Sequence, residues 1–223
     1  GFIDLAGNAG IDGDNTSNGS AVRFDKTSPV LQPVDNVTTP TSDNTSLSYT
    51  FSSTEAGTIN YSVCSGSPDN ASADNNTITF DALADGTYSN CKITVTDNSS
   101  NSVTLNINSF VIDTTAPTVS SISPTDNQSG VSISDNISVT FSEAMDTTSV
   151  TTNTSNSSCS GSVQLSSDDF SSCVQMSSSP SSSNSNKTFT IDPSSNLSYS
   201  TTYKIRLTTG VKDTTGNTLS SQY

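Results

Sequence analysis

Residues 87–112 read TYSNCKITVTDNSSNSVTLNINSFVI, and this stretch decides the fold class of the chain. Apolar and polar residues alternate on both sides of a short polar turn, which is the pattern of two half-buried antiparallel strands joined by a hairpin. The alternation after the turn is interrupted near residues 108–109, where we expect a bulge or a change of register. The stretch therefore predicts an all-β protein.

The turn at the centre of this stretch recurs along the chain. Each copy begins with Asp and ends with Asn, as DLAGN at 4–8, DNSSN at 97–101 and DTTGN at 213–217. Two more phrases repeat in the same order. The first phrase is a strand followed by a linker that contains Pro, as in VRFDKTSP at 22–29 and FVIDTTAP at 110–117. The second is an apolar strand followed by an acidic residue, as in YTFSSTEA at 49–56 and VTFSEAMD at 139–146. Such repeats indicate a tandem array.

The repeats divide the chain into three parts. Residues 1–25 are expected to be the C-terminal hairpin and last strand of a preceding unit, or else a donor strand. Residues 26–112 form the first full unit and residues 113–223 the second, whose last strand is expected to be incomplete. The chain is thus interpreted as a window on a longer periodic protein.

Short strands fill both units. We predict them near 46–53, 58–64, 76–81, 87–96, 102–112, 118–123, 137–142, 187–192 and 201–208. Such spacing is typical of tandem Ig-like Greek-key β-sandwiches. Tyr88 and Tyr203 begin penultimate strands, where a tyrosine corner would bind upstream backbone. Residues 177–186 are expected to be a solvated loop.

Composition limits the classes of partner. Net charge is −14 with only seven Lys and Arg, which argues against nucleic acid or an anionic membrane. No apolar run is long enough to span a membrane. The expected partners are therefore neighbouring Ig-like repeats or identical subunits.

Four cysteines fall two and two into the units, without a CxxC pair and without any histidine. A zinc site would need four thiolates drawn from both units, so two disulfides, Cys64–Cys91 and Cys159–Cys173, are predicted instead. The second is expected to hold a hairpin within the Ser-rich segment 151–186. Disulfides imply an oxidising compartment, and hence an extracellular or cell-surface location.

The second unit resembles the bacterial Ig-like family found in S-layer and giant surface proteins. The resemblance rests on APTVSSISPTDNQSGVSISDNISVTFSEAMD at 116–146 and KTFTIDPSSNLSYSTTYKIRLTTGVKDTTGN at 187–217. The first unit looks like a related repeat, most clearly at DALADGTYSNCKITVTDNSSN (81–101). The resemblance implies an extracellular tandem array that works in spacing, display or adhesion.

Catalytic residues are not evident. The absence of histidine excludes Ser-His-Asp and Cys-His catalysis, and the adjacent Asp168 and Asp169 are interpreted as a solvated turn rather than a glycosidase pair.

Calcium is the expected cofactor, because acidic residues from three separate loops should meet at one pole of each sandwich, where hard oxygen ligands suit Ca²⁺. The candidate metal ligands are Asp25, Glu55 and Asp97 in the first unit and Asp113, Glu143, Asp146 and Asp213 in the second. Each of these acids could instead serve only its own turn.

Three functions fit these observations. The leading interpretation is a noncatalytic structural segment, a stalk, fibre or spacer, of a long extracellular bacterial surface protein. One alternative is a subunit of an extracellular filament or surface layer, assembled head to tail by strand exchange. The other is a spacer attached to a secreted hydrolase.

Overall fold

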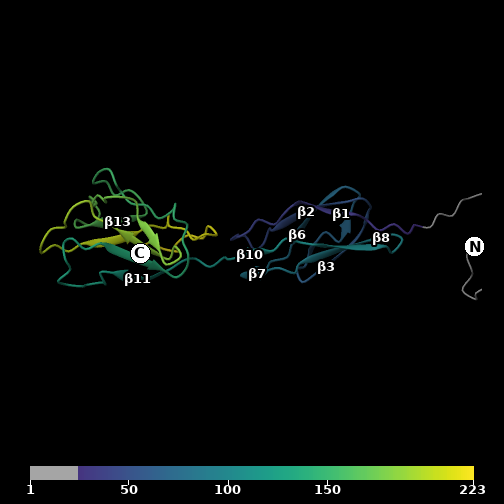
Figure 1. Ribbon diagram of the computed structural model, residues 1–223, viewed down its shortest axis with the longest axis horizontal. Coiled ribbons are helices and arrows are strands. Elements are labelled where there is room, and N and C mark those ends of the chain that lie inside the picture. Colours follow the sequence, from purple (N-terminus) through teal and green to yellow (C-terminus); the bar gives the residue numbers. More distant parts are fainter. Residues whose placement is uncertain (1–24) are drawn as a thin grey trace, which may run out of the picture.

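A computed structural model describes residues 25–223 of the chain. The predicted hairpin and strand at 1–25 therefore lie outside the described residues, except for Asp25. Figure 1 shows two β-rich bodies placed end to end, with the first unit toward the N-terminus and the second unit beyond it. Each body has its own hydrophobic core. Within the described residues there are strands and no helix, in agreement with the predicted all-β class.

The first unit is a sandwich of two four-stranded antiparallel sheets. One sheet has the order β1-β2-β6-β4, from Leu31–Asp35, Ser48–Ser53, Asn75–Phe80 and Gly66–Ser67. The other has the order β5-β3-β8-β9, from Asn70–Ala71, Gly57–Ser62, Lys92–Asp97 and Ser102–Asn106. From β2 to β6 the chain crosses between the two sheets at every step, whereas β1 and β2, and β8 and β9, are neighbours within one sheet, as in an Ig-like sandwich.

The predicted interruption near residues 108–109 is confirmed. The last strand breaks into β9 and β10 (Phe110–Ile112), and β10 pairs with β7 (Gly86–Tyr88) instead of continuing along β8. The prediction of one strand over 87–96 is wrong, because that stretch divides into β7 and β8. The break lets Phe110 turn into the core, where its ring stacks 5.2 Å from that of Tyr88.

The second unit repeats the first sheet closely. Its four-stranded sheet has the order β11-β12-β15-β14, from Val119–Ser123, Ile137–Phe141, Thr188–Ile191 and Ser181–Ser183. Opposite lies a pair, β13 (Val163–Ser166) and β16 (Lys204–Leu207). The solvated loop predicted at 177–186 is wrong at β14, which pairs with β15 while its side chains stay exposed.

Both predicted tyrosine corners are present. The Tyr88 hydroxyl donates to the carbonyl of Ala84 at 2.9 Å, and the Tyr203 hydroxyl accepts the N–H of Ser198 at 3.1 Å. Both predicted disulfides also form. Cys64 and Cys91 follow β3 and precede β8, so this bridge joins neighbouring strands of one sheet, unlike the bridge between sheets in antibody domains.

Candidate metal centres at the poles of the two units

An aspartate organises the turn that carries each candidate centre. The N–H groups of Thr215, Gly216 and Asn217 donate to Asp213 Oδ1 at 2.8, 2.7 and 2.9 Å. The side-chain amide of Asn217 donates to Oδ2 at 2.8 Å. Asp213 is only 2% exposed, so its charge is compensated by these donors rather than by water. The spacing Asp-x-x-Gly-Asn is therefore that of a self-capping turn.

The first unit builds the same turn from a different sequence. Asp97 Oδ1 accepts the N–H groups of Ser99 and Asn101 at 2.7 and 2.9 Å. Donation from the Asn101 side chain is the main cause that lowers the pKa of Asp97. Ser100 takes a positive φ of 70° at the position where the second unit has Gly216, with φ 99°.

A second repeated contact positions the glutamate of each centre. The N–H of Thr118 donates to Ser142 Oγ at 3.0 Å, and the N–H of Ser142 returns to the carbonyl of Thr118 at 2.9 Å. Val30 and Thr54 make the same exchange in the first unit, at 2.9 and 3.1 Å. These bonds fasten the incoming strand to the end of β12 or β2, one residue before the glutamate.

Three carboxylates meet at each pole. One group consists of Asp25, Glu55 and Asp97, and the other of Asp113, Glu143 and Asp213. Within each group, each residue has a carboxylate oxygen that lies within 4.8 Å of those of the other two. Six of the seven acids selected from the sequence therefore come together as two sets of three. The seventh, Asp146, is not in these groups. Its Oδ1 accepts the N–H and hydroxyl of Thr148 at 2.9 and 2.8 Å, and this lowers its pKa.

The glutamates respond to the crowding of negative charge. Desolvation first, and then the carboxylates of Asp113 and Asp213, raise the pKa of Glu143. Desolvation, Asp25 and Asp97 raise the pKa of Glu55 in the same way. Each set therefore favours uptake of a positive charge, either a proton on the glutamate or a cation among the oxygens.

An acidic residue of the first unit binds the linker between the two units, residues 113–115. Asp85 Oδ1 accepts the N–H and the hydroxyl of Thr114 at 2.9 and 2.7 Å, and its Oδ2 accepts the hydroxyl of Thr115 at 2.8 Å. The Thr114 hydroxyl is the main cause that lowers the pKa of Asp85. Sequence reasoning missed this residue, because nothing marks Asp85 apart from its place before the Gly86 turn.

The second unit holds the same linker from the other side. The carbonyl of Asp113 accepts Asn217 Nδ2 at 2.8 Å and the Thr215 hydroxyl at 3.3 Å. At the outer pole of the first unit, Asn101 Nδ2 reaches the carbonyl of Asp25 at 3.4 Å. The outer pole thus repeats the bond by which Asn217 holds the linker of the second unit.

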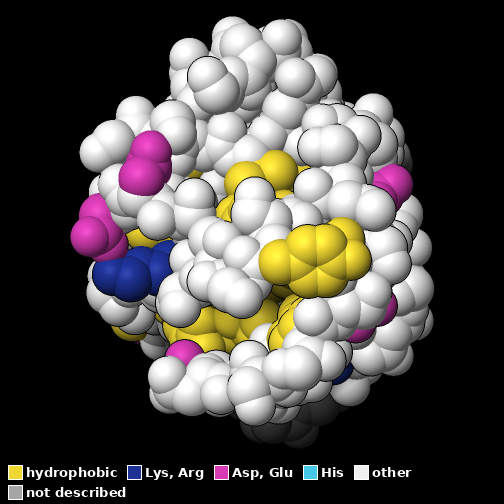
Figure 2. Space-filling model, turned by 90° about the vertical axis from the view of Figure 1, so that its left-hand side faces the viewer, with side chains coloured by type: hydrophobic (Ala, Val, Ile, Leu, Met, Phe, Trp, Pro, Cys, Tyr) yellow, Lys and Arg dark blue, Asp and Glu magenta, His cyan; other side chains and the backbone are white. Residues whose placement is uncertain are grey.

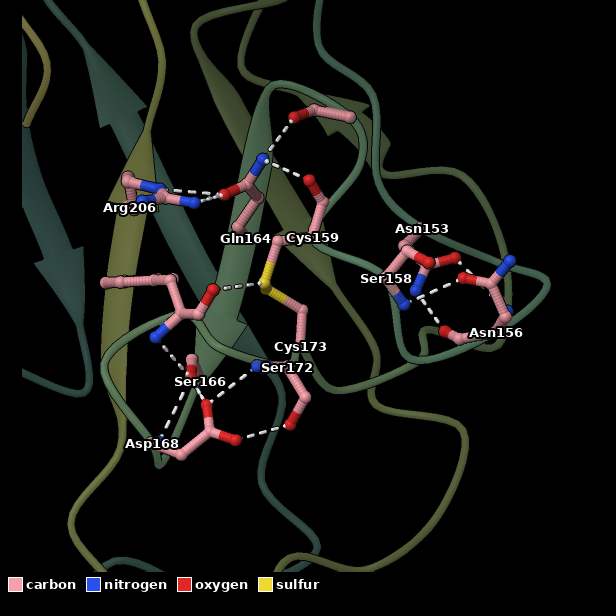
Figure 3. Close-up of a disulfide and its surroundings, with 12 residues drawn as sticks. Asn153, Asn156, Ser158, Cys159, Gln164, Ser166, Asp168, Ser172, Cys173 and Arg206 are labelled. Atoms are coloured by element: carbon pink, nitrogen blue, oxygen red, sulfur yellow. Dashed lines mark hydrogen bonds between the residues drawn. A yellow bond between two sulfur atoms is a disulfide. The ribbon is translucent and has the colours of Figure 1, made fainter.

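The disulfide between Cys159 and Cys173 closes a loop over the outer face of β13 (Figure 3). All four residues of β13 are buried, including Gln164, which donates to the carbonyls of Cys159 and Gly161 at 3.2 and 2.9 Å. Arg206 Nε donates to Gln164 Oε1 at 2.7 Å. The hairpin predicted in this segment is instead a loop that covers β13. After Cys173 the loop forms a hydrogen bond with β13, in which the N–H of Val174 donates to the carbonyl of Leu165 at 2.8 Å.

Arg206 and Asp168 shape this loop further. The guanidinium of Arg206 lies 4.0 Å from the centroid of the Phe170 ring, a cation–π contact. Asp168 accepts the hydroxyl of Ser172 at 2.6 Å and its N–H at 2.9 Å, which lowers the pKa of Asp168 to about 2. Asp168 is thus a turn residue, the role expected from its sequence.

Comparison with known proteins identifies the family. Residues 113–223 match the family model of the bacterial Ig-like domain. The second unit belongs to the bacterial Ig-like family. The match confirms the resemblance inferred from the sequence and indicates a bacterial surface or structural module. No curated protein matches the chain.

The bacterial Ig-like assignment and the two disulfides are consistent with an extracellular location. Among the described residues no helix could cross a membrane.

Proposed function

We propose that this chain is a noncatalytic structural segment, a stalk or spacer, of a long extracellular bacterial surface protein. The observation that carries the proposal is the linker, because Asp85 of one unit and Asn217 of the next both bind it. Bonds from both sides restrict rotation about residues 113–115, so the two sandwiches are kept end to end (Figure 1). A spacer needs such a junction, whereas a chain with free hinges would collapse.

The chemistry of the chain supports the noncatalytic part of the proposal. The sequence has no histidine, and the two groups of three carboxylates among residues 25–223 lie at turns whose aspartates are occupied by hydrogen bonds. Two disulfides add stability that a secreted spacer needs outside the cell. These features support a mechanical role for the chain.

Small-angle X-ray scattering of the chain tests the stalk. We expect an elongated particle with one well-defined maximum dimension. Asn217→Ala removes the shorter of the two bonds to the carbonyl of Asp113 and should broaden the distribution of interatomic distances by loosening the junction. Asn153→Ala, in the same unit but away from the junction, is the matched control. A compact particle in wild type, or equal broadening in both variants, would contradict the proposal.

We further propose that each pole binds one calcium ion, through Asp25, Glu55 and Asp97 or through Asp113, Glu143 and Asp213. Calcium prefers carboxylate oxygens presented by loops, and the three-carboxylate groups offer them within 4.8 Å of one another. The pKa of Glu143 is raised first by desolvation and then by the carboxylates of Asp113 and Asp213, and this second cause supports the proposal because a cation would cancel that repulsion. Bound at the junction, calcium would stiffen the stalk.

The variant Glu143→Gln tests whether the pole binds metal or only forms a turn. Asp213, not Glu143, caps the turn, so the substitution removes a candidate ligand and leaves the turn intact. The folded pKa of Glu143 is raised, so without calcium its contribution to stability is lost as pH rises through that pKa. At pH 7 in chelator the variant should therefore melt at a higher temperature than wild type. In calcium the order should reverse, because the variant loses a ligand.

The control is Asp126→Asn, which neutralises an exposed acid at the other pole of the same unit. Isothermal titration with CaCl₂ should show binding by wild type and by this control, and weaker binding by Glu143→Gln. Calcium at a hundred times Kd stabilises by about 2.7 kcal/mol, which is readily detected by calorimetry. Identical melting of wild type in calcium and in chelator would remove the metal while leaving the stalk proposal intact.

A further inference from the structure

The segment that follows β1 binds the last strand of the first unit. Thr41 pairs in parallel with Ile112. The N–H of Thr41 donates to the carbonyl of Val111 at 3.0 Å, and the carbonyl of Thr41 accepts the N–H of Asp113 at 3.0 Å. The N–H of Val111 donates to the hydroxyl oxygen of Thr39 at 2.9 Å, across 72 residues of sequence. The part of the chain that enters this unit is therefore joined directly to the part that leaves it.

Asn108 adds two bonds at the point where the last strand has no regular ladder. Between β9 and β10 the chain crosses from β8 to β7, at the interruption that the sequence predicted. Asn108 Oδ1 accepts the N–H of Val37 at 3.0 Å, and Asn108 Nδ2 donates to the carbonyl of Val37 at 3.1 Å. A side-chain amide offers a donor and an acceptor as a backbone peptide does, so Asn108 replaces a pair of ladder bonds. We call the contacts of residues 37–41 with residues 108–113 the latch.

Buried side chains fix the two parts of the latch in register. Val37 is 2% exposed, and Phe110 and Ile112 are each 1% exposed. The ring of Phe110 stacks on those of Phe80 and Tyr88, with centroid distances of 5.8 and 5.2 Å. The latch therefore cannot slide without pulling these side chains out of their contacts in the core, which costs free energy.

The direction of the latch matches the direction of tension along the chain. In a parallel pair the N-terminus of one strand and the C-terminus of the other lie at opposite ends. Tension that enters through residues 26–30 and leaves through residues 113–115 pulls the two parts along their length in opposite directions. The bonds of the latch are then sheared together instead of opening one after another. Figure 2 looks along the long axis of the molecule and shows one compact outline, so tension between the two ends runs along this axis.

β1 is a weaker barrier on the same path. Its pairing with β2 also resists tension, but the register shifts between Pro33 and Asp35. Pro33 has no N–H to donate to the ladder. Once β1 has separated, the latch is the contact that still holds the entering segment to the leaving strand.

We propose that the latch is the force-bearing element of the first unit and sets the tension at which this unit unfolds. The proposal rests on the stalk function proposed above, because a stalk carries tension between its two ends. While the latch is closed, tension passes from residues 37–41 directly to β10. The strand pairs β2–β6 and β3–β8, which hold most of the core, are then bypassed.

The disulfides determine how far each unit extends after it unfolds. The bridge Cys64–Cys91 has a sequence separation of 27, and Cys159–Cys173 has one of 14. At the length of an extended residue, the closed loops hold back about 90 Å in the first unit and about 45 Å in the second. A thiol reductant therefore lengthens the unfolding step of each unit by a different amount, and this difference identifies the unit in a pulling experiment.

Single-molecule pulling of the 223-residue chain, held by its two ends in optical tweezers, tests the proposal. Asn108→Ala removes both bonds to Val37, and Thr39→Val removes the acceptor of the Val111 N–H at nearly constant side-chain size. Each variant should unfold the first unit at a lower force than wild type. Because Asn108→Ala loses two hydrogen bonds, its unfolding rate at fixed force should rise roughly tenfold to a hundredfold. The second unit should unfold at an unchanged force.

Asn76→Ala is the matched control in the same unit. The Asn76 side chain accepts the N–H of Ser72 at 2.7 Å and donates to the carbonyls of Ser72 and Asp74 at 3.0 and 2.8 Å. These bonds lie within one loop, away from the path of tension. The control should therefore lower the melting temperature of the first unit, as Asn108→Ala does, and leave its unfolding force unchanged.

An equal loss of force in Asn108→Ala and Asn76→Ala would overturn the proposal, because the force would then follow overall stability. Wild-type force in both latch variants would overturn it as well. If Asn108→Ala does not fold, Thr39→Val decides the question alone, since Thr39 is exposed and lies outside the core. None of these results bears on the stalk proposal, which the scattering experiment and the Asn217→Ala junction variant test separately.

Discussion

The core of the first unit contains a tyrosine whose hydroxyl provides a sharp test of the structure. Tyr49 lies on β2 and is 1% exposed, and its hydroxyl has no hydrogen-bond partner among residues 25–223. Tyr88, in the same unit, donates its hydroxyl to the carbonyl of Ala84 at 2.9 Å. The same change to Phe at these two positions should therefore have opposite effects on stability.

The magnitudes follow from the hydrogen-bond inventory. A buried hydroxyl without a partner costs about 1–3 kcal/mol, so Tyr49→Phe should raise the free energy of unfolding by an amount in that range. A satisfied hydrogen bond contributes about 0.5–1.5 kcal/mol net, so Tyr88→Phe should lower it by that amount. In a domain of this size, 1 kcal/mol corresponds to a shift in melting temperature of about 4–8 °C.

Differential scanning calorimetry of wild type and both variants measures these shifts in the transition of the first unit. Tyr203→Phe, whose hydroxyl accepts the N–H of Ser198, is the control, because it should lower only the transition of the second unit. A Tyr49→Phe variant that melts lower than wild type would refute the reasoning, since the hydroxyl would then have a partner in solution.

Three other predictions concern the turns and the disulfide loop. Ser100→Gly should stabilise the first unit by about 0.5–1 kcal/mol in urea unfolding, because it relieves a positive φ of 70°, whereas Gly216→Ser should cost the second unit a similar amount. Replacing Cys159 and Cys173 by Ser opens a loop with a sequence separation of 14, so calorimetry should show the second unit destabilised by about 3 kcal/mol and the first unchanged. The pKa of Asp168 is lowered to about 2, so the stability that its carboxylate adds to the second unit is complete above pH 4 and is lost as pH falls toward 2. In the Asp168→Ala variant the melting temperature of the second unit should therefore change less between pH 4 and pH 2 than it does in wild type.

Local pattern determined the class of this protein and several of its details. Alternating apolar residues encode strands because side chains in a strand point to opposite faces, so β2, β6, β12 and β15 were all expected near their observed bounds. The break before β10 and both tyrosine corners were also predicted, since each depends on a few neighbouring residues. The repeated phrases placed six of the acids into two equivalent sets, because each phrase puts its acid at the same place in its unit.

Only the tertiary structure decided where strands form without a pattern of alternating apolar and polar residues. β1 escaped prediction because Pro33 interrupts its pattern, yet at a sheet edge a residue without an N–H is tolerated. β14 carries only serine, and it exists because the backbone of β15 offers it bonds. β13 buries Gln164 as well as Val163, because the disulfide loop covers the face that would otherwise meet solvent.

The junction shows the same division between local and distant causes. The acid that caps its own turn, Asp213, is visible in the sequence because its partners lie two to four residues away. Asp85 binds Thr114, 29 residues along the chain, and Asn217 binds the carbonyl of Asp113 across 104 residues. Contacts at such separations depend on how the sandwiches bring their loops together, and no local pattern encodes that. The sequence by itself determined the units, and the tertiary structure alone decided how one unit holds the next.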